Sequence, residues 1–326
     1  MRSLQNALIL AVFLWSLPIV SVIAQTFPSS SVTIVVPFPP GGGTDAMARG
    51  LANELSKLWK QPVVIENVPG ANSIIGAAKV AKSAPDGRTL LVTIDSTVVH
   101  NRFLYKSLPY DPDKSLLPVT MLGRSGQLII ANPSFPANSM SELLAVALRS
   151  KEGVEYGSTG NGTQPHLLFE AMAVREGGRF LQVPYKGIGP IVTAVMTGEV
   201  KISIASPASA GAMVASGQVK ALAIGGPKRS TKFPKVPTLA ESGFPNLHAS
   251  TWWGLFAPAG TSAALVGKIN RDVAVAAQQP TFIEKNFTMP GVELVMNTSA
   301  EFTEMIRSEV AQTAEMVRLA GVSPQD

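Results

Sequence analysis

Cysteine is absent from the 326-residue sequence. Its absence excludes disulfides, thiolate zinc sites, iron–sulfur clusters, a cysteine nucleophile and a lipid-modified N-terminal cysteine. Charged residues are also scarce, at 15%, against 46% hydrophobic residues. This balance is typical of a chain that folds into a globule, and the length suggests about two domains.

A strong excess of basic charge is lacking too, since 27 lysines and arginines face 22 acidic residues. The basic residues are scattered singly, whereas a nucleic-acid partner requires clusters that neutralise phosphates. We therefore expect no nucleic-acid function and at most a mild preference for anionic small molecules.

Motifs for catalysis and cofactors are missing as well. The three histidines, His100, His166 and His248, lie far apart, and no His-Glu-x-x-His pattern occurs. Ser158 lacks a Gly-x-Ser-x-Gly elbow. The sequence contains no P-loop, and Pro165 stands where a dinucleotide-binding fingerprint needs its third glycine. We predict no enzyme activity, no metal and no cofactor.

The one long hydrophobic stretch lies at the N-terminus. Arg2 precedes a short apolar run from Ala7 to Leu17, and small residues up to Ala24 fit the site that a signal peptidase reads. We predict a cleavable signal peptide over residues 1–24 and a soluble periplasmic protein. A membrane anchor is the alternative, but the apolar run is short of the ~20 residues that a span requires.

Strand and helix patterns alternate along the rest of the chain, which predicts parallel α/β sheets. We expect two doubly wound α/β domains with a ligand cleft between them and a hinge of two crossing strands. The first domain would comprise residues 25–125 plus 251–326, and the second residues 126–250. Two independent domains in tandem fit the pattern nearly as well.

Glycine-rich loops follow the predicted strands at the sheet edge where α/β proteins bind ligands. The loop 37–45 has three consecutive glycines, and the loop 156–163 surrounds glycine N–H groups with hydroxyls and an amide. Such a nest before a helix suits a carboxylate. The loop that ends at Ser73 meets the same description. Asp45 either caps its helix or orders a water, and His166 either contacts a ligand or ties down its loop.

Seven short motifs then occur in an order that resembles a known family. They are Ile34-Val35-Val36-Pro37-Phe38 through Gly41-Gly42-Gly43-Thr44-Asp45, Glu66-Asn67-Val68-Pro69-Gly70-Ala71, Ala84-Pro85-Asp86-Gly87, Leu108-Pro109-Tyr110-Asp111-Pro112, Gly160-Asn161-Gly162-Thr163, Pro184-Tyr185-Lys186-Gly187 and Val236-Pro237-Thr238. From Val32 to about Val322 the chain resembles the Bug proteins, extracytoplasmic solute receptors of tripartite tricarboxylate transporters. The resemblance implies a periplasmic-binding-protein fold that closes over a small carboxylate or dicarboxylate, with membrane permease subunits as partners. It implies no catalysis and no cofactor, and we expect a monomer.

The resemblance also implies a set of ligand-binding residues. One carboxylate is expected at the nest of the second domain, at Ser158, Thr159, Asn161, Gly162 and Thr163. The far end of the ligand is expected to meet the first-domain loop, largely through waters, at Phe38, Pro39, Gly42, Gly43, Thr44 and Asp45. Ser96 and Thr97 are expected to face the cleft, and Ser73 is included with them.

One departure from the family pattern bears on the ligand. Members commonly carry a Phe-Asp pair where this chain has Ile204-Ala205-Ser206, so a polar partner for a ligand amine is missing. Ala205 and Phe38 suggest an apolar pocket centre, which favours an aromatic or aliphatic diacid over citrate. The alternatives to a receptor are a secreted α/β hydrolase or lyase acting on a carboxylic acid, and a periplasmic sensor with the same pocket.

Overall fold

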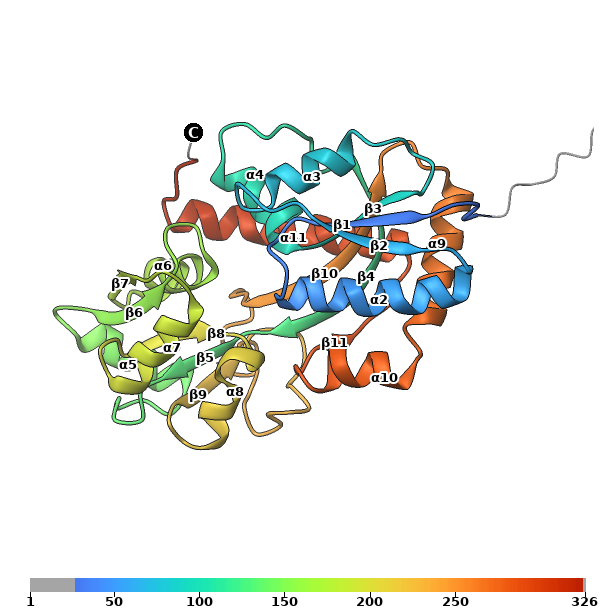
Figure 1. Ribbon diagram of the computed structural model, residues 1–326. Coiled ribbons are helices and arrows are strands. Elements are labelled where there is room, and N and C mark those ends of the chain that lie inside the picture. Colours follow the sequence, from blue (N-terminus) through green and yellow to red (C-terminus); the bar gives the residue numbers. More distant parts are fainter. Residues whose placement is uncertain (1–26, 325–326) are drawn as a thin grey trace, which may run out of the picture.

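The computed structural model describes residues 27–324, which form two β-sheets covered by helices (Figure 1). The signal peptide expected over residues 1–24 lies outside the described residues. No helix within residues 27–324 is long and apolar enough to cross a membrane.

The first sheet has six strands in the order β11-β4-β10-β3-β1-β2. They are β1 (Val32–Val36), β2 (Val63–Asn67), β3 (Thr89–Ile94), β4 (Leu116–Gly126), β10 (Ser250–Pro258) and β11 (Glu293–Leu294). Strand β1 is parallel to β2 and β3, whereas β10 is antiparallel to β3 and β4. The helices that accompany this sheet in the chain are α2 (Gly43–Trp59), α3 (Ile74–Ala81), α4 (Asn101–Leu104), α9 (Ala263–Ala276), α10 (Pro280–Ile283) and α11 (Ser299–Leu319), with two π-helical turns, η1 (Ser96–His100) and η2 (Glu284–Thr288).

The second sheet has five strands in the order β7-β6-β8-β5-β9. They are β5 (Leu128–Ala131), β6 (Val154–Ser158), β7 (Phe180–Pro184), β8 (Ile202–Ala205) and β9 (Lys220–Ile224). Strand β6 is parallel to β7 and β8, and β5 is antiparallel to β8 and β9. Its helices are α5 (Met140–Arg149), α6 (Gln164–Glu176), α7 (Ile188–Thr197) and α8 (Pro207–Ala215).

The two predicted α/β units are confirmed, since each sheet is accompanied by its own helices. The expectation of parallel sheets is wrong for β10 and β5, each of which enters its sheet from the other sheet and runs against its new neighbours. It is also wrong for the two-residue edge strand β11, which is antiparallel to β4. Hydrophobic patterning reports which face of a strand is buried and carries no information on its direction.

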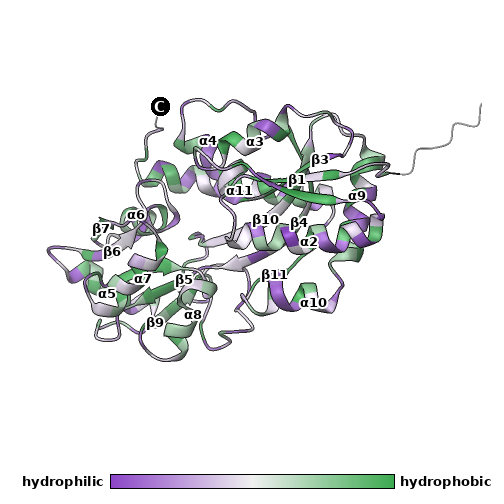
Figure 2. Ribbon diagram, viewed as in Figure 1, coloured by the Kyte–Doolittle hydropathy of each residue, from purple (hydrophilic) through white to green (hydrophobic). Residues whose placement is uncertain are grey.

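Apolar residues of strands and helices form the core on both faces of the sheets. Helix α2 illustrates the pattern, because Met47, Leu51 and Leu55 recur on one face and pack against Ile34 and Leu90. Figure 2 shows the same division, with hydrophilic and hydrophobic residues alternating along α2 and hydrophobic colours concentrated in strands such as β5.

Two backbone segments pass between the sheets and are hydrogen bonded to each other. Strand β4 continues into β5 through Gln127, and the chain returns through Ala249 into β10. The Gln127 N–H donates to the Ala249 carbonyl oxygen at 2.8 Å, and the Gly225 N–H donates to the Gln127 carbonyl oxygen at 2.8 Å. Three chain segments therefore meet at this crossing.

Helix α11 forms a further link between the two sheets (Figure 1). Phe302 in its first half belongs to a core cluster of the first sheet, whereas Met316 near its end packs into the core of the second. Glu315 also lies 3.6 Å from Arg175 of α6 in an ion pair. The last turns of α11 thus contact the second sheet, and the domain limits drawn from the sequence stay a prediction.

Candidate functional site

A cleft of about 650 Å³ lies between the two sheets. Residues from strands, helices and loops that accompany both sheets line it. They are Gly43, Ala46, Met47, Asn72, Ile94, Asp95, Ser96, His100, Leu104, Ser125, Gln127, Gly162, Thr163, Gln164, Ile188, Ser206, Ala208, Ser209, Thr251, Trp253, Lys285, Asn286, Pro290 and Val292. A concave site with apolar walls and a few polar groups is typical of small-molecule binding.

The first turns of four helices line this cleft. Gly43, Gln164 and Ile188 are the first residues of α2, α6 and α7, and Ala208 is the second residue of α8. A helix N-terminus has unpaired N–H groups and a partial positive charge of roughly half an elementary charge. Four such ends around one cavity favour an anionic ligand.

Both π-helical turns also contribute to the cleft wall, as such turns often do at functional sites. Turn η1 supplies Ser96 and His100, and turn η2 supplies Lys285 and Asn286. The Ser96 Oγ is buried and has no hydrogen-bond partner within the described residues, so it is available to a ligand. Lys285 is the one lysine or arginine among the described residues that line the cleft.

Asp95 is the one carboxylate among the described lining residues, and its side chain is buried. Burial raises the pKa of Asp95 to about 6, an effect that the nearby His100 opposes and the Glu309 carboxylate adds to. The Asp95 Oδ1 accepts a hydrogen bond from Thr251 Oγ1 of β10 at 2.7 Å. A carboxylate at this position is the main electrostatic obstacle to an anionic ligand.

The sequence model of the protein family described as "Tripartite tricarboxylate transporter family receptor" matches residues 47–322. The chain belongs to this family. The resemblance to the Bug proteins inferred from the seven motifs is thereby confirmed. Protein BugT of Bordetella pertussis is 37% identical over 299 residues, which cover 91% of this chain and 91% of that protein.

Two solved structures of other proteins are similar to this receptor, and the description of each names a ligand. An R. palustris protein solved with adipate is 30% identical with a TM-score of 0.76, over 92% of this chain and 100% of that chain. MatC of Rhodopseudomonas palustris, solved with bound malate, is 31% identical with a TM-score of 0.72, over 89% of this chain and 100% of that chain. Both similarities extend over nearly the whole chain.

The first-domain loop of this receptor is fixed mainly by Asp45. Its Oδ2 accepts hydrogen bonds from the Gly41 N–H and from Arg49 Nε, both at 2.9 Å, and its Oδ1 accepts from Asn67 Nδ2 at 2.9 Å. Burial alone would raise the pKa of Asp45, but the bonds from Arg49, Gly41 and Asn67 outweigh it and lower the pKa to about 2. The helix N-cap is Gly42, so Asp45 does not have the capping role expected from the sequence; its carboxylate instead holds its own loop through Gly41, Arg49 and Asn67. The ordering of a water by Asp45 stays a prediction.

We expect Asp45→Asn to destabilise the receptor in a pH-dependent manner. The folded pKa of about 2 lies below the ordinary 3.8, so the carboxylate stabilises the fold above pH 3.8 and this contribution is lost as the pH falls toward 2. At pH 7 the free energy of unfolding should drop by about 2 kcal/mol. Urea denaturation at pH 7 and at low pH measures the free energy of unfolding. The difference in this free energy between wild type and variant should become smaller in acid.

The control for this prediction is Glu304→Gln, since that side chain is 69% exposed in an ion pair with Arg307. Exposed pairs contribute little, about 0–1 kcal/mol. If the difference in the free energy of unfolding between wild type and Asp45→Asn stayed constant from pH 7 into acid, the role of the Asp45 charge would be contradicted.

The other residues predicted in the first-domain loop differ in position. Gly43 lines the cleft, while Thr44 is buried and its Oγ1 accepts a hydrogen bond from Trp253 Nε1 at 3.1 Å. Phe38 is half-buried and packs against the core of the first sheet. Pro39 and Gly42 are exposed and do not line the cleft.

The residues of the predicted carboxylate nest also differ in position, and only some of them line the cleft. Gly162 and Thr163 line the cleft, Thr159 and Asn161 are exposed outside it, and Ser158 is fully buried. Ser158 Oγ accepts hydrogen bonds from the Gly160 N–H and Gln182 Nε2, at 3.1 and 2.7 Å. Thr163 Oγ1 donates to the Gly160 carbonyl oxygen at 2.6 Å. Much of the polar capacity of the nest is therefore used within the loop.

His166 ties this loop down, because its Nδ1 accepts the Gly162 N–H at 3.0 Å. Burial lowers the pKa of His166, which suits a neutral acceptor. The Gly162 N–H is consequently satisfied inside the protein. Of its two sequence interpretations, the structure supports the loop-fixing one.

The remaining predicted residues do not reach the cleft, except for Ser96. Ser73 and Thr97 are buried and their hydroxyls lie 2.8 Å apart in one hydrogen bond. Ala205, the last residue of β8, is buried in the core of the second sheet. As a ligand-binding set, the fifteen residues stay a prediction; the cleft brings together Gly43, Ser96, Gly162 and Thr163.

Sequence reasoning missed several lining residues, chief among them Lys285, Asp95 and Gln164. Gln164 Nε2 donates to the Ser250 carbonyl oxygen, which joins α6 to β10. The helix pattern that starts at Gln164 could have indicated it, since first-turn residues face the ligand side of an α/β sheet. No local signal marks Lys285, because its π-helical turn has no sequence signature.

Proposed function

We propose that the protein is a periplasmic receptor that binds a small carboxylate or dicarboxylate in the cleft and delivers it to the permease subunits of a tripartite tricarboxylate transporter. The observation that carries this proposal is the convergence of four helix N-termini on one cleft, which also holds the side chain of Lys285. Relatives solved with adipate and with malate are similar over nearly the whole chain.

In the proposed complex, backbone N–H groups at the first turns of α6, α7 and α8 bind one carboxylate. The unpaired Ser96 hydroxyl and the Lys285 ammonium, on the first-sheet wall, bind the other end of the ligand. The apolar side chains of Met47, Ile188 and Trp253 contact the carbon chain between the two ends. This arrangement favours an aliphatic or aromatic diacid over citrate, whose middle carries further polar groups.

The protein acts by binding and not by catalysis. Within residues 27–324, no serine that lines the cleft is hydrogen bonded to a histidine, so a serine nucleophile with its base is lacking there. We further propose that the chain is exported by a cleavable signal peptide and acts as a monomer. Closure of the two units about the crossing at Gln127 and Ala249 would exclude water from the bound anion and strengthen its hydrogen bonds.

We expect a thermal-shift screen of dicarboxylates of different chain length to identify at least one stabilising ligand. At 100 times its dissociation constant, such a ligand stabilises the folded state by about 2.7 kcal/mol. The matched control for each diacid is its diamide, which has the same carbon chain without charge and should give no shift. Isothermal titration calorimetry then gives the affinity and the stoichiometry.

Two outcomes would contradict the proposal. A purified protein that converts a carboxylic acid or its ester would be an enzyme and not a receptor. A diamide that binds as tightly as its diacid would show that the helix N-termini do not select for charge.

A further inference from the structure

A cluster of two carboxylates and one imidazole lies at the wall of the cleft. Asp95 directly follows β3, His100 ends the π-helical turn η1, and Glu309 lies in the middle of α11. One ligand atom of each lies within 4.8 Å of the others. The two ends of the turn η1, its N-cap Asp95 and its last residue His100, and Glu309 of α11 thus present polar atoms to one small volume.

The carboxylate oxygens of this cluster are short of hydrogen-bond donors. Glu309 is 4% exposed, yet its Oε1 has no hydrogen-bond partner among residues 27–324, and His248 Nε2 lies 3.7 Å from it. The Asp95 Oδ2 faces His100 Nε2 at 3.9 Å, which is also too long for a hydrogen bond. A buried charged oxygen without a donor destabilises the fold. Of the cluster's described oxygens, Glu309 Oε1 is the one that is buried without a hydrogen-bond partner. Burial would lower the pKa of His248, but the Glu309 and Asp95 carboxylates raise it, so His248 compensates part of their charge.

The second oxygen of each carboxylate is held in place by the protein. Asp95 Oδ1 accepts from Thr251 Oγ1 at 2.7 Å, and Glu309 Oε2 accepts from Trp252 Nε1 at 2.6 Å. Hydrogen bonds of this kind orient the carboxylate ligands of metal sites while leaving the other oxygen for the metal. Both donors come from β10, so one strand aligns the two acids.

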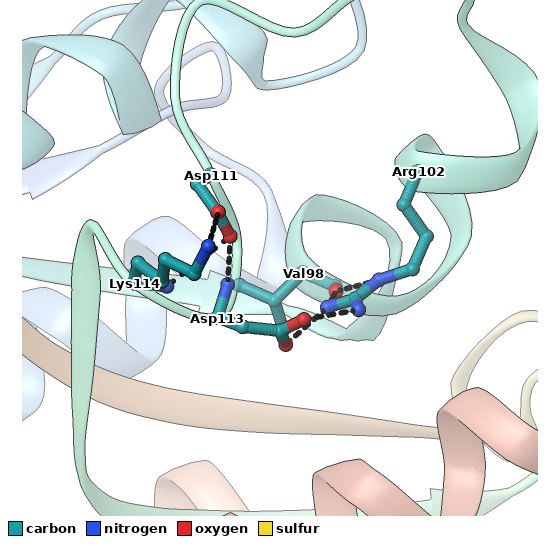
Figure 3. Close-up of polar contacts among 5 residues, drawn as sticks. All are labelled: Val98, Arg102, Asp111, Asp113 and Lys114. Carbon is teal, nitrogen blue, oxygen red and sulfur yellow. Dashed lines mark hydrogen bonds and ion pairs between the residues drawn. The ribbon is translucent and has the colours of Figure 1, made fainter.

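The third group is fixed by the contacts of Arg102, which follows η1. Arg102 donates to the Val98 carbonyl oxygen at 2.6 and 3.1 Å and to both carboxylate oxygens of Asp113 at 2.8 Å (Figure 3). Asp111 and Lys114 complete the loop that carries Asp113 in the same view. These bonds hold the backbone of the turn that ends at His100, whose Nε2 lies 3.9 Å from Asp95 Oδ2.

We propose that Asp95, His100 and Glu309 bind a divalent transition-metal ion, with Zn²⁺ as the representative. Asp95 Oδ2 and His100 Nε2 are 3.9 Å apart, and one ligand atom of each of the three residues lies within 4.8 Å of the others. Two ligands of one metal at about 2.0–2.2 Å can be about 4.4 Å apart at most, so the Glu309 carboxylate closes in by a few tenths of an ångström when the ion binds. A mixed set of one imidazole and two carboxylates suits Zn²⁺ or Mn²⁺, whereas Ca²⁺ prefers oxygen ligands alone. Asp95 and His100 line the cleft, which gives the ion a route to the site.

The site has a consequence that rests on the proposed function. A bound cation neutralises the negative charge of Asp95, the one carboxylate among the described residues that line the cleft. Loading the site thus removes the main electrostatic obstacle to an anionic ligand and adds positive charge to the wall.

Zinc binding is tested by calorimetry on the full mature chain, without a histidine tag and after dialysis against EDTA. We expect one Zn²⁺ per chain with a dissociation constant in the micromolar range or tighter. His100→Gln and Glu309→Gln should each weaken the affinity at least tenfold. Glu304→Gln is the matched control, because it makes the same change on the same helix at an exposed residue, and its zinc affinity should equal that of the wild type.

Folding of the variants is checked by their unfolding temperatures without metal, and zinc should raise that temperature in the wild type and in Glu304→Gln only. Because metal binding itself is the readout, the result is independent of whether the cleft takes a carboxylate. The absence of a zinc-binding isotherm in the wild type would overturn the site. Zinc bound equally by wild type, His100→Gln and Glu309→Gln would assign it to the protein surface and overturn the site as well.

Discussion

Gly225→Ala is expected to lower the free energy of unfolding by more than about 3 kcal/mol, a loss large enough to prevent folding of a marginally stable chain. A Cβ at this position would lie 1.7 Å from the Ala249 carbonyl oxygen, and that atom belongs to backbone. Backbone cannot rotate away as the end of a side chain can. The methyl group must therefore separate the strands that cross between the two sheets.

The separation would break bonds on which the crossing depends. The Gly225 N–H donates to the Gln127 carbonyl oxygen and the Gln127 N–H donates to the Ala249 carbonyl oxygen. Both are buried between the sheets, where a donor or acceptor without a partner costs about 1–3 kcal/mol. Steric overlap and lost hydrogen bonds thus act in the same direction.

Gly189→Ala is the matched control for this prediction. Gly189 lies in the first turn of α7, and a Cβ there meets no atom within 4 Å. Alanine favours helix over glycine by about 0.5–1 kcal/mol, so this variant should be as stable as the wild type or more so. Urea denaturation followed by circular dichroism measures both variants. Equal midpoints for Gly225→Ala and Gly189→Ala would show that the crossing tolerates displacement.

The sequence predicts the elements of this receptor better than their arrangement. Buried strands such as β1 and amphipathic helices such as α2 have periodic apolar residues, and these local patterns alone determine where they lie. Local patterns do not determine the direction of a strand: β10 runs antiparallel to β3 because the chain passes through the second sheet before it returns. The link made by α11 depends likewise on contacts with α6 that no local pattern contains.

Local sequence patterns also predict only some residues of the candidate site. The glycine loops were predicted from composition, and Gly43, Gly162 and Thr163 do line the cleft. Ser158 looks identical to a ligand-binding serine in the sequence, but its hydroxyl is used by Gly160 and Gln182. Asp95 and Glu309 lie far apart in the sequence, so only the folded chain reveals their proximity.

Lys285→Met is expected to weaken binding of a dicarboxylate at least tenfold while leaving the matched monocarboxylate nearly unchanged. Lys285 is exposed on the cleft wall in the π-helical turn η2, and no other lysine or arginine lines the cleft within the described residues. A hydrogen bond to a charged group contributes about 1.5–3 kcal/mol, and 1.4 kcal/mol corresponds to a tenfold change in affinity. Methionine keeps most of the apolar stem and removes only the charge.

The monocarboxylate separates this role from a general effect on the cleft. Its single carboxylate is expected at the helix N-termini of the second sheet, so it does not need the ammonium group of Lys285. Lys114→Met serves as the control for loss of a positive charge, because Lys114 is 84% exposed and paired with Asp111 away from the cleft. Its affinity for both ligands should equal that of the wild type.

Titration calorimetry of each variant with a diacid and its monoacid, at low and at physiological salt, measures the effect. Salt screens an exposed ion pair, so the diacid advantage of the wild type should shrink as the ionic strength rises, whereas that of Lys285→Met should stay small throughout. Equal losses for diacid and monoacid would mean that Lys285 shapes the cleft as a whole. An unchanged diacid affinity would assign the second carboxylate to Ser96 and backbone groups alone, and Lys285 would then have no part in selecting the ligand.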